Sequence, residues 1–259
     1  MRLSEALGIV SPTVLSVVGA GGKTSLLMAL SDQWEAERIP YVLTTTTRMA
    51  YEQVEHLAPI VEEEFHSGLQ KALSDLGRFG RAGWFRSVKD GKVQGIPPEW
   101  VDRLCDYRCS WHLLIEADGA AGRLLKAPAA HEPVVPMRSD VTVGVLHLDA
   151  IGCPLDTTIV HRPGLVRPIV GKPNGALIEP EDLAKLALHR KGIFQGAAGK
   201  KILLLSGGVT DPAGDTMQRQ WTEAIVDRLW KDGNGRIERV IRTKGYGREM
   251  RVSRLYRQP

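Results

Sequence analysis

The chain has 259 residues, of which 43% are hydrophobic and 25% charged, and its net charge is +4. This composition is ordinary for a globular protein with a buried core, and it excludes a disordered or fibrous chain. No run of about 18 apolar residues predicts a transmembrane helix, and the first residues do not resemble a secretory signal. With only three cysteines we expect a cytoplasmic protein without a membrane association, and the positive charge favours anionic ligands.

Strands and helices are predicted to alternate along the chain. We expect buried strands where short apolar runs end at glycine or at polar residues, and helices where apolar residues recur at helical spacing. The predicted strands are 15–19, 41–44, 111–117, 141–148 and 201–205, and the predicted helices are 23–37, 99–104, 181–189 and 220–230. This order predicts one α/β domain over residues 1–259, with a mostly parallel sheet between two layers of helices.

Two segments depart from the alternation. Residues of about 78–98 contain Asp90-Gly91 between short β-like runs, which predicts a β-hairpin inserted between parallel strands. Residues 236–259 are rich in arginine and predict a basic edge strand and tail. Such a tail can contact nucleic acid, but charge on a final edge strand more often prevents edge-to-edge pairing, and few aromatic residues accompany it. We therefore do not expect a nucleic-acid partner.

The strongest chemical motif is a glycine-rich loop between the first predicted strand and the first long helix. Glycines allow a tight turn that points backbone N–H groups inward, and the following helix adds its own free N–H groups and dipole. A lysine in this context contacts the β- and γ-phosphates and a threonine hydroxyl ligates Mg²⁺. The predicted phosphate-binding residues are Gly19, Ala20, Gly21, Gly22, Lys23, Thr24 and Ser25.

The loop departs from the longer GxxxxGK[ST] pattern, because Val17 stands where that pattern has its first glycine. The motif is the shorter GxxGK[ST] form. The alternative is a glycine-rich turn with a surface lysine. The flanking strand and helix favour phosphate binding, so the fold we expect is like that of a P-loop NTPase.

Two carboxylates end the strand predicted at 111–117. Glu116 and Asp118 are two residues apart, so their side chains share a face if the strand continues that far. Open α/β sheets bind ligands at the carboxyl ends of their strands, which would place these acids opposite the glycine loop. We predict that Thr24, Glu116 and Asp118 organise Mg²⁺ and that one carboxylate orients a nucleophile. The alternative is a pair of solvated acids.

Two further segments are candidates for the same site. The strand predicted at 41–44 ends in threonines and an arginine, and Thr45, Thr46 and Arg48 can bind phosphate there. The loop after the acidic strand carries Lys126, which can neutralise a phosphoryl group, and His131 and Glu132, which can recognise an acceptor. The alternatives are β-favouring threonines before an exposed arginine, and an ordinary surface loop.

The cysteines give a weak signal. Cys105 and Cys109 have a C-x₃-C spacing with a histidine nearby, but without a second pair this is poor support for zinc. Nothing in the sequence assigns a role to Cys153.

With these residues identified, the chain resembles the YqeC family. The matching segments are VVGAGGKTSLL, VLTTTTRM, LLIEADGAAGRLLKAPAAHEPVVP and IVHRPG, between about residues 15 and 165. The resemblance implies a P-loop-type nucleotide-binding accessory protein in the maturation of selenium-dependent molybdenum hydroxylases. It also implies a selenium- or molybdopterin-related small molecule and a client hydroxylase as partners. The positions that it marks as functional are Lys23, Thr24, Arg48, Glu116, Asp118, Lys126, His131 and Glu132.

Three functions are consistent with the sequence. The first is an enzyme dependent on ATP and Mg²⁺, such as a kinase, ligase or NTPase, that transfers or hydrolyses a phosphoryl group. The second is a nucleotide-switched delivery chaperone that does no chemistry on the cofactor. The third is a nucleic-acid-binding protein. Residues 205–211 read LSGGVTD and lack the Asn-Lys-x-Asp pattern that recognises guanine, so ATP is the default nucleotide.

Overall fold

We describe a computed structural model of the chain, covering residues 1–107, 110–208, 211–233 and 235–258. Within these residues nine strands form the main sheet, in the order β14-β13-β12-β10-β1-β8-β2-β5-β4. Every neighbouring pair is parallel except β13 and β14. The strands are β1 (Val14–Gly19), β2 (Tyr41–Thr45), β4 (Ile60–Val61), β5 (Arg81–Phe85), β8 (His112–Glu116), β10 (Val141–His147), β12 (Lys200–Ser206), β13 (Arg239–Lys244) and β14 (Arg251–Arg257).

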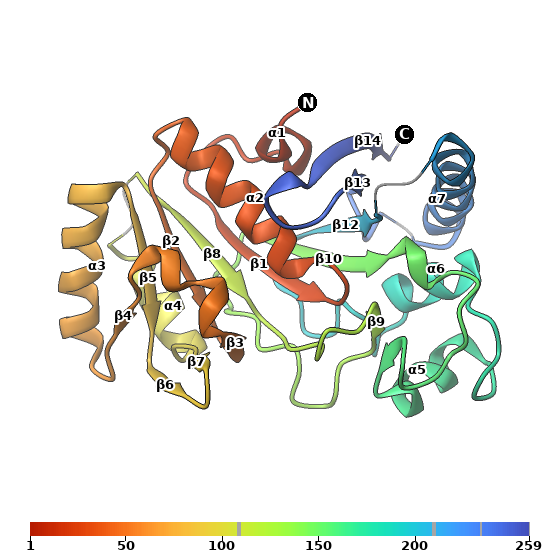
Figure 1. Cartoon of the computed structure of the whole chain (residues 1–259), viewed down its shortest axis with the longest axis horizontal. Helices are drawn as coiled ribbons and strands as arrows, with labels where there is room; N and C mark the ends of the chain where they lie inside the picture. The colour runs from red at the N-terminus through yellow and green to blue at the C-terminus, as the bar shows by residue number, and fades with distance from the viewer. Residues whose placement is uncertain (108–109, 209–210, 234, 259) are drawn as a thin grey trace.

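Helices cover both faces of this sheet, which gives the three layers that the sequence predicts. The apolar residues of α1 and α2 pack on one face, and those of α3 to α7 pack on the other. Figure 1 shows α2 crossing the sheet, with α3 at the left end and α7 at the right. The helices are α1 (Leu3–Leu7), α2 (Lys23–Ala36), α3 (Phe65–Phe79), α4 (Pro98–Leu104), α5 (Pro163–Val170), α6 (Pro180–Leu188) and α7 (Pro212–Asp232).

The central strands are apolar along their length because both of their faces are covered. All residues of β1, β8 and β10 are buried. This explains why these strands read as continuous β-branched and leucine-rich runs rather than alternating ones. Alternate side chains enter the two separate cores: Leu113 and Ile115 belong to one, and Leu114 belongs to the other. The strands that carry the site are therefore fixed from both sides.

Two small sheets lie beside the main one. The hairpin predicted around Asp90-Gly91 is present, and its second strand also pairs antiparallel with a short strand that follows β2. The hairpin strands span 87–94 only, because α3 extends to residue 79 and β5 belongs to the main sheet. The second small sheet is a parallel pair. The strands are β3 (Arg48–Ala50), β6 (Ser87–Lys89) and β7 (Lys92–Gln94) in one sheet, and β9 (Leu125–Lys126) and β11 (Val160–His161) in the other.

The C-terminal segment differs in detail from the edge strand that we expect. β13 is an internal strand that pairs with β12, and β14 forms the edge. The sequence misses α1, α5 and the two-residue strands because these elements are too short to show a period. Residues 51–76 are helical in tendency but weakly patterned, and only their second part lies in α3; β5 falls within the range predicted for the hairpin. Residues 51–64 form two short 3-10 turns, η1 (Tyr51–Gln53) and η2 (Glu55–Leu57), and β4; two further turns are η3 (Leu148–Ala150) and η4 (Gly247–Glu249).

Across the residues that the structure describes, no helix has the length and apolar character needed to cross a membrane.

Trp84 on β5 provides a test of the packing between α3, α4 and the sheet. The side chain is fully buried, and its ring centroid lies 5.8 Å from that of Phe65 and 5.6 Å from that of Trp100. We expect Trp84→Ala to lower the free energy of unfolding by about 3–5 kcal/mol, the usual cost of removing a buried aromatic. Phe79→Ala, at a 59% exposed side chain, is the control and should cost less than about 1 kcal/mol. Equal losses in urea unfolding would contradict this packing.

Candidate functional site

The glycine loop and the acidic strand end lie next to each other because β1 and β8 are neighbouring parallel strands. Val17 is in register with Glu116, so the residues that follow both strands emerge at the same edge of the sheet. This edge is formed by carboxyl ends of strands, where open α/β sheets bind ligands. The predicted juxtaposition of the loop with Glu116 and Asp118 is therefore present in the structure.

All three glycines of the loop have a positive φ that strains other residues, and two of them also approach β10 closely. Gly19 has a φ of 95°, and a Cβ there would lie 2.2 Å from the carbonyl oxygen of Val145. Gly21 has a φ of 70°, and a Cβ there would lie 2.6 Å from the Cβ of His147. The Ala20 N–H donates to the Val145 carbonyl at 2.9 Å. The loop is thus pressed against the end of β10, with its curvature set by left-handed backbone conformations.

The loop leads directly into the N-terminus of α2. Gly22 caps this helix and Lys23 is its first residue, with no acidic side chain in the first turn. The first N–H groups of a helix have no acceptor within the helix, and its dipole favours negative charge at this end. The loop and helix together therefore have the backbone geometry and the positive dipole end that suit an anionic group.

Lys23 is buried between the loop and the acidic strand end. Its Nζ donates to the Gly19 carbonyl at 2.8 Å and lies 3.3 Å from Oδ1 of Asp118. Burial disfavours the ammonium, but the carboxylates of Asp118 and Glu116 outweigh it and hold the pKa of Lys23 above its ordinary value. The lysine is therefore charged, and its ammonium is placed at the mouth of the loop.

Asp118 connects three groups. Its Oδ2 accepts the Gly19 N–H at 3.0 Å and lies 3.0 Å from Nζ of Lys126. Lys126 is fully buried on β9, and its Nζ also donates to the Gly119 carbonyl at 2.6 Å and to Glu132 at 3.0 Å. With three partners, Lys126 has no free donor directed at the pocket. Its role in the structure is to hold the two carboxylates.

Glu132 continues this network to the pocket wall. Arg162 donates to both of its carboxylate oxygens, at 3.0 and 3.3 Å. Burial works against the Glu132 carboxylate, but Lys126 and Arg162 hold the pKa of this group below its ordinary value. Positive and negative side chains therefore alternate along one network of contacts, in the order Lys23, Asp118, Lys126, Glu132 and Arg162. Each buried ion has a neighbour of opposite charge.

Glu116 has a different environment. It is buried at the end of β8, and the Thr24 hydroxyl donates to its Oε2 at 3.1 Å. Burial, with a further contribution from Asp118, raises the pKa of Glu116 although Lys23 opposes this. A carboxylate and a hydroxyl at this distance are oxygen ligands of the kind that Mg²⁺ prefers. The described residues contain no cluster of three or more His, Cys, Asp or Glu that could hold a metal ion. A cation here would thus need water or ligand oxygens as well.

These residues surround a cavity of about 620 Å³. Several of the sequence-predicted site residues line it: Gly21, Gly22, Lys23, Thr24, Ser25, Arg48, Glu116 and Glu132. Further lining residues are Met49, Ala50, Gln53, Lys92, Gly119, Ala120, Ala121, Gly122, Arg123, Leu124, His147, His161, Arg162 and Tyr246. Positive side chains outnumber negative ones on this wall, so the cavity suits an anionic ligand.

Other predicted residues support the site without lining the cavity. The Thr45 hydroxyl donates to the Glu116 carbonyl at 2.7 Å, and the Thr46 hydroxyl donates to the Val134 carbonyl at 2.7 Å. These threonines fasten the end of β2 to its neighbours. The side chain of His131 is 77% exposed and approaches only the Glu132 carboxylate, at 3.9 Å. The structure therefore places His131 outside the cavity.

The further lining residues were not among the predicted site residues, and three of them come from segments outside the predicted motifs. Lys92 lies on the hairpin, His147 ends β10, and Tyr246 follows β13. No sequence motif marks them, because they come from segments that only the sheet order brings together. The position of His147 at the end of a predicted strand was the one available signal.

The two cysteines that the structure describes do not line this cavity. The Cys105 thiol donates to the Val101 carbonyl at 3.4 Å, and the Cys153 thiol donates to the Asp149 carbonyl at 3.3 Å. Cys109 lies outside the described residues.

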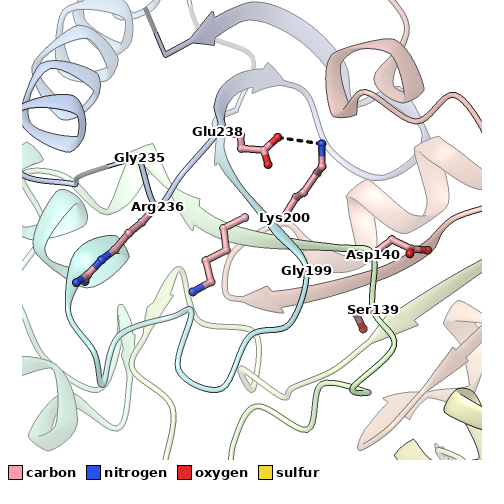
Figure 2. Close-up of a pocket in the computed structure, with 8 residues that line it drawn as sticks. Ser139, Asp140, Gly199, Lys200, Gly235, Arg236 and Glu238 are labelled. Carbon is pink, nitrogen blue, oxygen red and sulfur yellow. Dashed lines mark ion pairs between the residues drawn. The ribbon is translucent and has the colours of Figure 1, made fainter.

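A second cavity, of about 560 Å³, lies at the opposite edge of the sheet (Figure 2). It is formed by residues that precede β10, β12 and β13, so it faces the amino ends of the strands. Lys200 lies 3.5 Å from Glu238 there, and both side chains are largely exposed. The cavity is lined by Ser139, Asp140, Gly199, Lys200, Lys201, Gly235, Arg236 and Glu238. It lacks the buried charges and the helix N-terminus of the first cavity.

Comparisons with known proteins agree with the resemblance noted from the sequence. A family model described as YqeC protein matches residues 15–164. The protein named "Uncharacterized protein YqeC" from Escherichia coli (strain K12) is 36% identical to this chain over 188 residues, which are 71% of each chain. No solved structure matches. The range matched by the family model contains the glycine loop, the buried charge network and His147, but not Tyr246.

Lys126 provides a test of the buried charge network. Lys126→Met keeps the volume but leaves Asp118 and Glu132 each with one cation fewer. We expect a loss of about 3 kcal/mol in the free energy of unfolding, the lower end for a broken buried ion pair, because Lys23 and Arg162 remain. Lys92→Met, at an exposed lysine of the same cavity, is the control and should change stability by less than about 0.5 kcal/mol. Similar urea midpoints for both variants would refute the network.

Proposed function

The chain belongs to the YqeC family, and we propose that it binds a nucleoside triphosphate with Mg²⁺ and transfers or hydrolyses the terminal phosphoryl group. One observation carries this proposal: the glycine loop and the N-terminus of α2 face a buried Glu116 that already contacts Thr24 at 3.1 Å. A loop of N–H groups for phosphates and an adjacent hydroxyl–carboxylate pair for the metal are the two parts that P-loop nucleotide binding requires.

Lys23 is the group that we expect to contact the phosphates. In the structure it donates to the Gly19 carbonyl and pairs with Asp118, which keeps it charged at the mouth of the loop. A bound triphosphate offers stronger acceptors than a backbone carbonyl. When Lys23 turns toward them, Asp118 keeps its contacts with Lys126 and the Gly19 N–H. We propose that Lys126 is a positioning residue that makes this exchange possible without leaving a buried carboxylate unpaired.

Thr24 and Glu116 fit the chemistry of Mg²⁺ better than Asp118 does. Asp118 is already engaged by two ammonium groups and a backbone N–H, whereas the Glu116 carboxylate accepts a hydrogen bond from the Thr24 hydroxyl. Mg²⁺ commonly takes one or two protein oxygens and completes its shell with water and phosphate oxygens. When bound, the ion would neutralise charge on the phosphates. Glu116 would hold it, and Asp118 would orient Lys23.

The cavity continues past the carboxylates to a second group of cations. Arg48 on β3 and Lys92 on β7 line it, and no salt bridge of the described residues engages either of them. The positive charge of this wall favours transfer of the phosphoryl group to an anionic acceptor rather than to water alone. The resemblance noted above suggests that the acceptor is related to selenium or molybdopterin chemistry.

A nucleotide-switched delivery chaperone remains the alternative within this site. It would use the same loop to bind the nucleotide but would leave its cargo chemically unchanged. Nucleotide consumption measured with and without selenium or molybdopterin compounds separates the two. A covalently changed small molecule supports the enzyme, and slow turnover that only a client hydroxylase stimulates supports the chaperone.

Nucleic-acid binding has less support in the structure. Several arginines of the C-terminal segment have acidic partners: Arg242 contacts Asp215, and Arg254 lies 3.5 Å from Glu223. These contacts neutralise part of the basic surface that such binding would use.

Lys23→Ala tests the phosphate site. We expect this change to weaken Mg·ATP binding by about 1.5–3 kcal/mol, the worth of a charge-assisted hydrogen bond. Calorimetry on the folded variant measures it, with circular dichroism as the check of folding. Lys200→Ala, in the cavity at the opposite edge of the sheet, is the matched control and should bind as the unmodified chain does. Unchanged affinity in a folded Lys23→Ala variant would reject this site.

The raised pKa of Glu116 predicts a pH-dependent metal effect. Mg²⁺ requires the carboxylate, so the gain in ATP affinity from Mg²⁺ should be full well above the pKa of Glu116. It should disappear as the pH falls through that value, at a higher pH than for an ordinary glutamate. Near and below that pKa, binding should release a proton, which calorimetry in two buffers of different ionisation enthalpy detects. Glu116→Gln should abolish both effects; if it retains them, another group holds the metal.

A further inference from the structure

The cavity has two ends, on opposite sides of β1. Glu116 ends β8 on one side, whereas His147 ends β10 and Tyr246 follows β13 on the other. We propose that the nucleoside of the bound triphosphate occupies this second end, with its base stacked on the ring of Tyr246 and a sugar or phosphate oxygen accepting a hydrogen bond from His147. This inference rests on the proposed function and specifies where its ligand extends.

The direction in which the nucleotide extends follows from the position of Thr24 and Glu116, the residues that would hold the metal. Thr24 and Glu116 would hold the Mg²⁺ ion, which would neutralise charge on the terminal phosphates, so these phosphates would lie on the β8 side. The glycine loop occupies the middle of the cavity. The rest of the nucleotide must then extend away from β8. Toward β10 and β13, the cavity is lined by His147 and Tyr246.

Tyr246 presents a fixed aromatic surface at the rim. The residue is 54% exposed, and its ring lies 5.7 Å from that of His147 at an interplanar angle of 12°. Its hydroxyl donates to Oδ2 of Asp149 at 3.0 Å, and Gln218 donates to Oδ1 of the same carboxylate at 2.7 Å. The ring is therefore oriented before a ligand arrives, which lowers the entropic cost of stacking a base on it.

His147 supplies an independent observation. It is 1% exposed, and its Nδ1 accepts the Asp149 backbone N–H at 3.2 Å. Burial lowers the pKa of His147, so the ring is neutral and its one proton is on Nε2. Among the described residues this Nε2 has no hydrogen-bond partner. A buried donor without an acceptor is costly, and a nucleotide oxygen at the neighbouring loop would satisfy it.

The same contacts indicate which bases are accepted. Both oxygens of Asp149 already accept a hydrogen bond, from Gln218 and from Tyr246. Recognition then relies on the face of the base, and aromatic stacking accepts any base because each has a π-face. We therefore expect ATP and GTP to bind with affinities within about tenfold of each other.

Calorimetry with Mg·ATP, Mg·GTP and Mg·tripolyphosphate tests the inference on the full chain. Tyr246→Ala should weaken binding of both nucleotides by about 5- to 100-fold, the usual effect of losing one base–aromatic stack, and should leave tripolyphosphate within about twofold. Tyr246→Phe keeps the ring and should stay within about threefold. Tyr107→Ala removes an exposed tyrosine that does not line the cavity and is the matched control.

His147→Asn is the second variant, because an asparagine oxygen can still accept the Asp149 N–H while the Nε2 donor is lost. We expect about 3- to 10-fold weaker ATP binding. An equal loss with tripolyphosphate identifies a phosphate oxygen as the acceptor, and a loss with ATP alone identifies the sugar.

The outcomes separate this inference from the proposed function. If tripolyphosphate and ATP both bind but Tyr246→Ala changes neither by more than about twofold, the base lies elsewhere and the inference is wrong. The same holds if the unmodified chain binds tripolyphosphate as tightly as ATP. If the folded chain binds no polyphosphate at all, the proposed function itself fails.

Discussion

The carboxylate of Asp118 holds the site together. It accepts the backbone N–H of Gly19, pairs with Lys23 at the start of α2 and pairs with the fully buried Lys126 of β9. The glycine loop, the end of β8 and the small β9–β11 sheet therefore share one anion. Burying such charges is costly unless each has partners. This interaction explains why the loop has its shape before a ligand binds.

The order of the parallel strands determines which functional groups lie together at the carboxyl edge of the sheet. β1 lies between β8 and β10, so the loop that follows β1 has carboxylates on one side and an imidazole on the other. The two sides differ in their electrostatics as well. Burial and the Asp118 carboxylate raise the pKa of Glu116, and burial lowers the pKa of His147. A cation beside Glu116 would offset the cost of its buried negative charge, whereas the neutral His147 can donate a hydrogen bond without carrying charge.

The sequence alone predicts the framework well, because the framework depends on local patterns. Continuous apolar runs mark the central strands, and the strand–glycine–helix sequence identifies Lys23 and Thr24. The sequence also identifies Glu116 and Asp118, because they stand at the end of a predicted buried strand. The roles within the site are harder to predict. Lys126 looks like a surface lysine in a loop, yet it is fully buried between two carboxylates. Tyr246 comes from a distant segment, and only the order of the strands places it at the cavity.

The wall of the cavity that carries Arg48 of β3 and Lys92 of β7 is held closely against the end of β2. Gly95 directly follows β7, and a Cβ there would lie 1.7 Å from the carbonyl oxygen of Thr45 at the end of β2. Its N–H also donates to the Thr47 carbonyl at 2.8 Å. Backbone contacts thus fasten the wall that carries Arg48 and Lys92 to the sheet, together with the buried side chains of Met49 and Val93. Arg48 and Lys92 are themselves exposed, so replacing their side chains should alter the charge of this wall without moving the backbone at the end of β2.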